Sequence, residues 1–266
     1  MKKIWISGGL ALALSLAGCG GNKESTETTS APTAPTGGTA TPDEVNGATV
    51  TGKVAFTGTA PAMKALDMSA TPACEHAHTT PVKSEEVIVN PNGTLKYAFV
   101  WIKSGPDVHD DGQHLSEKNW AVPTNAIMID QHGCMYAPHV IGIVTGQNIQ
   151  IKNSDPTNHN IHPQPKDNQD WNESQPPQSE DKLKTFPRQE VMIAVKCNIH
   201  PWMRAYIGAV SHPFFAVTSD DGTYTIKGLP PGTYTIESWH ERYGTQDQQI
   251  TVGAKDSKTV DFSYKG

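Results

Sequence analysis

The stretch VMIAVKCNIHPWM, residues 191–203, combines the pattern of a buried strand with side chains that bind soft metal ions. Alternate residues share one apolar face of this strand: Val191, Ile193 and Val195. Cys197 is the next residue on that face, so it is predicted to point inward where the strand ends. His200 and Met203 follow at steps of three residues. A thiolate, an imidazole and a thioether can therefore converge on one point within a tight loop.

A second imidazole is expected from an upstream segment. An alternating strand with Ile149 and Ile151 leads into NSDPTNHN, residues 153–160, and His159 is expected just past that strand, on a neighbouring loop. Two histidines, one cysteine and a weakly bound methionine form the trigonal set that selects copper; zinc is the alternative, but a thioether suits copper better. The sequence predicts one copper ion, cycling between Cu(I) and Cu(II), with four ligands: His159, Cys197, His200 and Met203.

The Cys-x-x-His-x-x-Met spacing of this loop resembles that of the cupredoxins, and the amicyanin-like members most closely. The pair His159-Asn160 is also similar to theirs. This resemblance implies a Greek-key β-sandwich with a type 1 (blue) copper site, in which Asn160 holds the two ligand segments together by hydrogen bonding. Pro201 is expected to restrict the loop and to keep its geometry in both redox states.

The resemblance also implies single-electron transfer rather than enzymatic catalysis. His200, on an exposed loop, is expected to be the electron portal, and partners are expected to dock transiently around it. Suitable partners are a c-type cytochrome, a dehydrogenase or a terminal reductase. Three alternatives stay open: a copper oxidoreductase with a second metal site, a copper storage or delivery protein, and an adhesion or carbohydrate-binding protein in which copper is structural. No His-x-His pair lies near either ligand segment, which argues against the first.

A longer resemblance covers residues 131–202. The run QHGCMYAPHV, residues 131–140, followed by the two ligand segments, is similar to a group of exported bacterial proteins. These are described as cupredoxin or methylamine-utilisation-type proteins with a regulatory-like end. Their function is poorly defined, so this resemblance implies no particular activity.

Short β-strands are predicted throughout the region past Thr49. Turn residues such as Gly, Pro, Asn and Asp separate them, and no long stretch has helical periodicity with caps. The main predicted strands are residues 49–57, 86–90, 95–102, 126–130, 140–144, 148–153, 191–197 and 205–210. This pattern predicts an all-β protein built from sandwiches.

The C-terminal region differs in character. DGTY at residues 221–224 and LPPGTY at residues 229–234 resemble the carboxypeptidase regulatory-like family, a small transthyretin-like β-sandwich. Asp-Gly between alternating runs also predicts a hairpin there. We expect this domain at residues 213–266 and the copper domain at residues 48–212. Domains of this family usually begin with a strand like residues 50–54, so the first strand can belong to the C-terminal sandwich.

The N-terminus has the pattern of an export signal. A positive start and a short apolar stretch end in LAGC, residues 16–19, which resembles the bacterial lipobox. Residues 1–19 are therefore expected to be a lipoprotein signal peptide with the lipid on Cys19, and residues 20–47, which are rich in Ser, Thr and Pro, a disordered tether. This predicts an exported protein, anchored on the periplasmic side of the outer membrane or at the cell surface. An ordinary signal peptide with an incidental cysteine is the alternative.

The remaining cysteines are expected to pair. In an oxidising compartment Cys74 and Cys134 form a disulfide by default, although Cys74, with His76 and His78 nearby, is an alternative metal ligand. A second copper centre is not expected from the other histidines near the ligand segments: His132, His139, His162 and His212. The formal net charge of −6, without a stripe of Lys and Arg, argues against nucleic acid as a partner.

Overall fold

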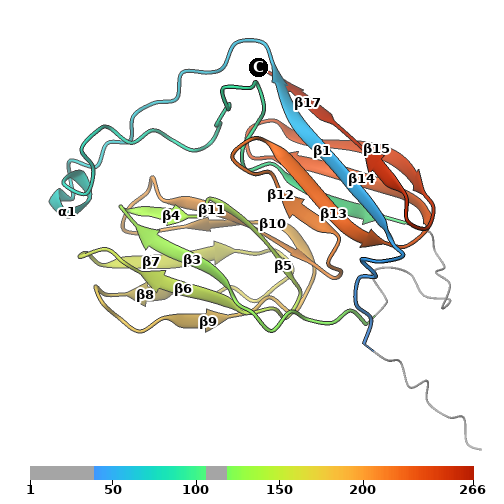
Figure 1. The fold of residues 1–266 in the computed structure, drawn as a ribbon. Coiled ribbons are helices and arrows are strands. Elements are labelled where there is room, and N and C mark those ends of the chain that lie inside the picture. Colours follow the sequence, from blue (N-terminus) through green and yellow to red (C-terminus); the bar gives the residue numbers. More distant parts are fainter. Residues whose placement is uncertain (1–38, 106–118) are drawn as a thin grey trace, which may run out of the picture. The chain divides into compact units, whose positions relative to one another are not determined.

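The computed structural model describes residues 39–105 and 119–266, and this part of the chain is almost entirely β (Figure 1). The all-β prediction is confirmed. Helix α1, Pro72–Glu75, is the one α-helix of the described residues, and none of their helices is long and apolar enough to cross a membrane. The expected signal peptide, its Cys19 and most of the expected tether lie outside the described residues.

Two sheets formed by residues 127–210 pack face to face, and we call them the central sandwich. One sheet has the order β4-β3-β6-β9 and contains Met135–Ala137, Ile127–His132, Ile149–Asn153 and Lys182–Lys184. The other has the order β5-β11-β10-β7-β8 and contains Val140–Val144, Arg204–Val210, Glu190–Lys196, His159–Gln164 and Glu173–Gln175. Both sheets lie in the same region of the fold in Figure 1.

Period-two alternation builds the core of the central sandwich and brings Cys197 to its end. Ile149 and Ile151 of β6 are fully buried, and Ile193 and Val195 of β10 contribute from the opposite sheet. Fully burying such a side chain stabilises the fold by about 1.5–3 kcal/mol. Cys197 continues the buried face of β10 and belongs to the same apolar cluster. The register of β10 is thus fixed by packing, and the inward direction of Cys197 follows from it.

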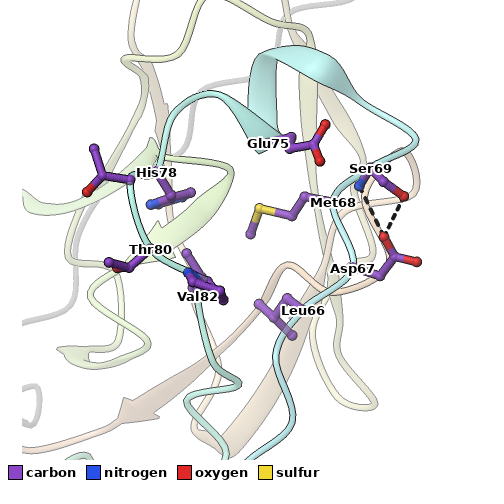
Figure 2. Close-up of a pocket in the computed structure, with 10 residues that line it drawn as sticks. Leu66, Asp67, Met68, Ser69, Glu75, His78, Thr80 and Val82 are labelled. Atoms are coloured by element: carbon purple, nitrogen blue, oxygen red, sulfur yellow. Dashed lines mark hydrogen bonds between the residues drawn. The ribbon is translucent and has the colours of Figure 1, made fainter.

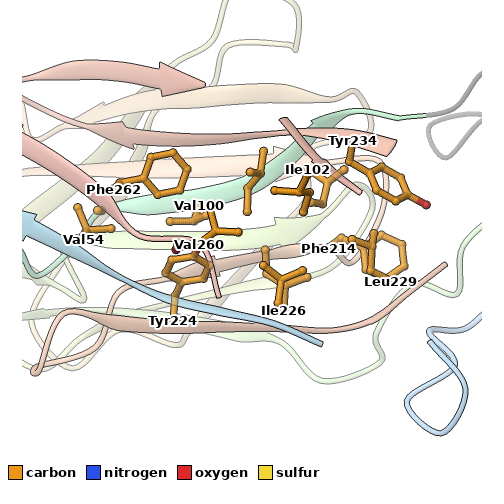
Figure 3. Packing of buried hydrophobic residues seen from close by; sticks show 14 of the residues in the cluster. Val54, Val100, Ile102, Phe214, Tyr224, Ile226, Leu229, Tyr234, Val260 and Phe262 are labelled. Atoms are coloured by element: carbon orange, nitrogen blue, oxygen red, sulfur yellow. Dashed lines mark hydrogen bonds between the residues drawn. The ribbon is translucent and has the colours of Figure 1, made fainter. Parts of the chain in front are cut away.

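The remaining strands form what we call the terminal sandwich. One layer has β1 (Ala48–Thr57) between β13 (Thr223–Leu229) and β16 (Ser257–Thr259), with β17 (Phe262–Lys265) also paired to β1. The other layer has the order β12-β2-β14-β15 and contains Phe215–Val217, Phe99–Ser104, Gly232–His240 and Gly244–Val252. Aromatic and branched side chains fill the space between the layers (Figure 3).

The expected domain boundaries need two corrections. The first strand was expected to be able to belong to the C-terminal sandwich, and β1 pairs there with β13, β16 and β17. Strand β2 was expected in the copper domain, but it pairs with β12 and β14 of the terminal sandwich. The central sandwich is therefore inserted between β2 and β12. The end of the expected tether is also part of the fold, because the Ala40 and Ala121 N–H groups donate to the Asn119 and Ala40 carbonyls, both at 2.7 Å.

Two local predictions were wrong. The Asp221-Gly222 turn does not close a hairpin, because β12 pairs with β2 whereas β13 pairs with β1, and the turn crosses between layers. The N-terminal strand occupies the place beside β13 that a hairpin partner would take. Residues 86–90 make only an isolated bridge between Val89 and Leu95 instead of a strand.

His240, the last residue of β14, is a buried titratable group in the terminal sandwich. It is 2% exposed, its Nδ1 accepts the Arg242 N–H at 3.2 Å, and the rings of Tyr243 and Tyr264 lie 5.0 and 5.8 Å away. Burial lowers the pKa of His240 to about 4. The folded protein therefore holds this imidazole in its neutral form.

This burial predicts a loss of stability in mild acid. The unfolded chain takes up the proton first, near pH 6.5, so the free energy of unfolding is expected to fall by about 2 kcal/mol between pH 7 and pH 5 through this group alone. The loss is complete below the folded pKa. Urea unfolding of the full chain and of His240→Gln at both pH values measures it. The free energy of unfolding is expected to change less between the two pH values in the variant than in the unmodified protein. Equal changes in the two proteins would contradict the role of His240.

Candidate metal centre

The loop from Cys197 to Met203 connects two antiparallel neighbours, β10 and β11, which pair up to Lys196 and Arg204. The Met203 N–H donates to the His200 carbonyl at 3.0 Å, and the Cys197 N–H donates to the Met203 carbonyl at 3.3 Å. These bonds close the loop on itself. Cys197 and Met203 are 3% and 0% exposed, and both belong to the core cluster of the central sandwich.

The predicted nitrogen and thiol ligands converge. Nδ1 of His159 lies 2.9 Å from Nδ1 of His200, and the Cys197 Sγ lies 3.9 Å from the latter atom. Candidate ligand atoms of the three residues all lie within 4.8 Å of one another, and all three side chains are buried. Two nitrogens that share one ion at about 2 Å each lie roughly 3 Å apart. The donor set thus fits a thiolate-binding metal ion such as copper.

His159 is held from its other ring nitrogen. It begins strand β7, rather than lying on a loop as expected, and its Nε2 lies 2.8 Å from Oδ2 of Asp155. A proton on Nε2 donated to this carboxylate leaves the Nδ1 lone pair directed at Cys197 and His200. Asp155 was not among the predicted site residues, and its only signal in the sequence is a carboxylate four residues before a predicted ligand.

The Asp155 carboxylate has two further donors. Its Oδ1 accepts the Gly133 N–H and its Oδ2 accepts the Cys134 N–H, both at 2.7 Å. Burial raises the pKa of this carboxyl, but hydrogen bonds from His159, Cys134 and Gly133 outweigh it and hold the pKa below its ordinary value. The negative charge of Asp155 is therefore stabilised next to the imidazole of His159.

Asn160 connects the two ligand segments. Its Oδ1 accepts the Asn198 N–H at 2.6 Å and lies 3.3 Å from the Cys197 Sγ, which donates to it. Its Nδ2 donates to the Asn172 side chain at 2.6 Å. The position of the thiol relative to β7 is fixed by these bonds. Pro201 is exposed on the loop, directly after His200.

Protonation in the metal-free protein follows from these contacts. Burial raises the pKa of Cys197, yet hydrogen bonds from His159 and from backbone N–H groups lower it overall. Burial lowers the pKa of His159, but its contacts with Asp155 and Cys197 outweigh burial and raise this pKa overall. The pKa of His200 is lowered by burial and by the charge of His159. A metal ion that binds between the two Nδ1 atoms would displace any proton held there.

A disulfide covers this site. Cys74 of α1 and Cys134 are joined, and the Cys74 Sγ lies 3.7 Å from Nε2 of His200. Trp202 donates its Nε1–H to the Cys134 carbonyl at 3.0 Å. His200 is only 1% exposed as a result, although the loop that carries it is exposed at Asn198, Ile199 and Pro201. No pattern in the sequence places Cys74 on this ring, because the two residues are 126 positions apart.

The other histidines have separate surroundings. His76 is exposed, and Nε2 of His78 is hydrogen-bonded to the Gly133 carbonyl at 2.7 Å. His78 also lines a cavity of about 310 Å³ beside α1, together with Leu66, Met68 and Glu75 (Figure 2). Neither His76 nor His78 belongs to a group of possible metal ligands among the described residues.

Histidines near the ligand segments are also dispersed. His139 is bonded to Glu241, His162 to Asp170 and His212 to the Ile102 carbonyl, and His132 is exposed. Within the described residues, the second group of possible ligands is Cys134, Asp155 and His159. It shares His159 with the first group, and its cysteine is in the disulfide.

Comparisons with known proteins identify part of the chain. The family model of the carboxypeptidase regulatory-like domain matches residues 205–265, a range that begins in β11 and contains β12 to β17. The terminal sandwich also needs β1 and β2, which lie outside that match. No curated protein matches the chain.

Solved structures with similar folds include copper proteins. A Cu-containing nitrite reductase (NirK) from Thermus scotoductus SA-01 has a TM-score of 0.30 and 18% identity over 34% of this chain, and only 23% of the reductase is covered. A purple cupredoxin from Nitrosopumilus maritimus has a TM-score of 0.27 and 17% identity over 31% of this chain and 98% of its own. A reduced Cu(I) form of an amicyanin mutant has a TM-score of 0.28 and 20% identity over 33% of this chain and 85% of its own. About a third of the chain thus has a weak fold similarity to cupredoxins.

The Asp155 contact predicts a loss of copper affinity in Asp155→Asn. The amide no longer supplies the charge that orients the His159 ring, and replacing such an outer partner typically weakens metal binding about 10–100-fold. Competition with a copper chelator measures the affinity. Asp181→Asn, a change in an exposed carboxylate bonded to Gln150, is the matched control and is expected to bind like the unmodified protein. Equal affinities for all three proteins would contradict the role of Asp155.

The disulfide predicts that small ligands are excluded from His200. In the double variant Cys74→Ser, Cys134→Ser, α1 is released from the site, and removing a native disulfide costs about 2–5 kcal/mol. Azide added to the copper-loaded variant is expected to change its visible spectrum, with no change in the unmodified protein. Circular dichroism checks that the variant is folded. An equal azide response in both proteins would show that the disulfide does not close the site.

Proposed function

We propose that this chain is a type 1 copper protein that transfers single electrons. One observation carries the proposal: the Nδ1 atoms of His159 and His200 lie 2.9 Å apart beside the thiol of Cys197, in a buried site. Met203 follows on the same closed loop as the weak fourth ligand. A set of two imidazoles, one thiolate and one thioether is the combination that type 1 copper uses.

The surrounding residues suit electron transfer because they hold the ligands in place. When bound, copper supplies the one-electron step between Cu(I) and Cu(II). Asp155 orients one imidazole, Asn160 fixes the thiol and the Cys197–Met203 loop is closed by its own backbone bonds. Ligands that cannot move far when the charge changes need little reorganisation. The disulfide lies against His200, with the Cys74 Sγ 3.7 Å from its Nε2.

The same features disfavour two of the three alternative functions. A catalytic copper needs an open coordination position, whereas the described ligands are buried and His200 is covered. A storage or delivery site has to exchange its metal readily, which a disulfide-covered site opposes. We therefore propose a protein without enzymatic activity. Its setting is also a proposal: export, a lipid anchor on Cys19, and a c-type cytochrome, dehydrogenase or reductase as the partner.

Copper loading tests this function directly. The full chain with Cu(II) is expected to bind one ion and to gain an intense visible thiolate-to-copper band, with a reversible one-electron redox titration. Cys197→Ser is expected to lose the band completely, because the thiolate is its source. His162→Asn, a change in a histidine outside the ligand cluster, is the control and is expected to keep it. A colourless protein, or a spectrum unchanged in Cys197→Ser, would contradict the proposal.

A further inference from the structure

A row of cationic and titratable side chains runs across three neighbouring strands next to the ligand loop. Lys196 of β10 is paired with Arg204 of β11 on one side and with His162 of β7 on the other. Directly paired residues project from the same face of a sheet. Since Cys197 and the residues in register with it face the core, this row faces outward. Lys196 directly precedes the ligand Cys197, and Arg204 directly follows Met203.

Lys196 and Arg204 are not neutralised locally. Like charges directly opposite each other on paired strands are destabilising. Within residues 39–105 and 119–266, neither side chain forms an ion pair, although Lys103, Lys182 and Lys184 all do. Acidic groups near the row have other partners: Asp170 is bonded to His162, and Glu241 is bonded to His139 and Tyr206. The positive charge of this pair is therefore directed to solvent.

These two cations line a hollow that reaches a metal ligand. The hollow has a volume of about 320 Å³, and its wall includes Lys196, Arg204, Tyr206, Pro201 and Cys197 itself. Of the three clustered ligands, His159 is 0% and His200 1% exposed, with the latter covered by the disulfide. Cys197 is itself 3% exposed and is the one of the three that lines the hollow, so the hollow adjoins the site at this residue.

An exposed apolar edge accompanies the charges. Ile199, on the ligand loop two residues after Cys197, is 46% exposed, and Pro201 is exposed as well. Transient redox complexes bury small areas and separate quickly, so a few apolar contacts with a charged surround suffice. This loop provides both kinds of contact within one short segment.

We propose that the hollow formed by Lys196, Arg204 and Cys197 is the docking site for a redox protein with an acidic surface, and that the electron passes through Cys197 rather than His200. This inference rests on the proposed electron-transfer function. A carboxylate of the partner enters the hollow between the two cations, and the pair steers the encounter. One electron moves from the reduced copper site to the oxidised partner, with no bond made or broken. Electrostatic steering raises association rates by about 10–10³-fold and weakens as salt is added.

The salt dependence of electron transfer separates this local patch from the net charge. The reduced, copper-loaded full chain is mixed in stopped flow with oxidised cytochrome c, either native and basic or succinylated and acidic. The net charge of −6 alone predicts repulsion of the acidic acceptor, and hence a rate that rises with salt. Docking at the hollow predicts the opposite: the rate with the acidic acceptor is expected to fall as salt rises.

Charge variants locate the effect. Lys196→Gln, Arg204→Gln is expected to slow the reaction with succinylated cytochrome c about tenfold at low salt. The control Lys258→Gln, Lys265→Gln removes the same charge from exposed positions of the terminal sandwich and is expected to change the rate little. An unchanged visible copper spectrum in both variants shows that the site is intact. Because the salt test uses the unmodified protein, it decides the question even where a variant does not fold.

Each outcome has one meaning. The docking site is overturned if the rate of electron transfer to succinylated cytochrome c rises with salt. It is also overturned if that rate falls equally in both double variants. Either result leaves the electron-transfer function standing. No transfer to either cytochrome overturns both. Ferricyanide, a small anionic oxidant, is a further acceptor. If Lys196→Gln, Arg204→Gln slows the reaction with ferricyanide but not the reaction with succinylated cytochrome c, the hollow binds small anions. That result also overturns the protein docking site.

Discussion

The carboxylate of Asp155 is the constraint on which the geometry of the candidate metal centre depends. It accepts hydrogen bonds from the His159 ring and from the N–H groups of Gly133 and Cys134, so one buried charge joins a ligand to the disulfide segment. An isolated buried carboxylate would cost several kcal/mol, and three donors remove most of that cost. The same bonds direct the His159 Nδ1 inward. Both imidazoles are thereby coupled to one covalently closed segment, His159 through Asp155 and His200 through contact with Cys74.

The ligand loop was predictable because its information is local. Alternation along β10 fixes the direction of Cys197, and the three-residue steps to His200 and Met203 need no knowledge of the rest of the fold. Asn160 was found through a resemblance rather than through spacing. Asp155 was missed because its role arises from partners 21 and 22 residues away, on a turn whose position depends on the sheet order. The cover over His200 involves Cys74, 126 residues away, and no pattern along the chain encodes it.

The fold shows the same division between local and long-range information. Strand type was predictable from alternation, whereas strand partners were not. The Asp221-Gly222 turn has the local sequence of a hairpin, and Gly222 has the positive φ of 73° that such a turn requires. Its flanking strands nevertheless join different layers, because β1 arrives from the far end of the chain and pairs with β13. Turn chemistry sets where the chain reverses, and the competition for sheet edges sets what it then pairs with.

If the chain transfers electrons as proposed, the cover over His200 decides the direction from which they reach the site, because Cys197, although only 3% exposed, lines the hollow. A buried metal centre needs at least one ligand close to the surface, since electron transfer weakens with distance. In this fold the disulfide and α1 lie over His200, whereas Cys197 is continuous with a strand whose outer face carries Lys196. The thiolate is also the most polarisable of the ligands and the one that shares most charge with the metal. With the His200 side covered, the proposed route runs through Cys197, and the cations on either side of the ligand loop, Lys196 and Arg204, would attract an anionic surface.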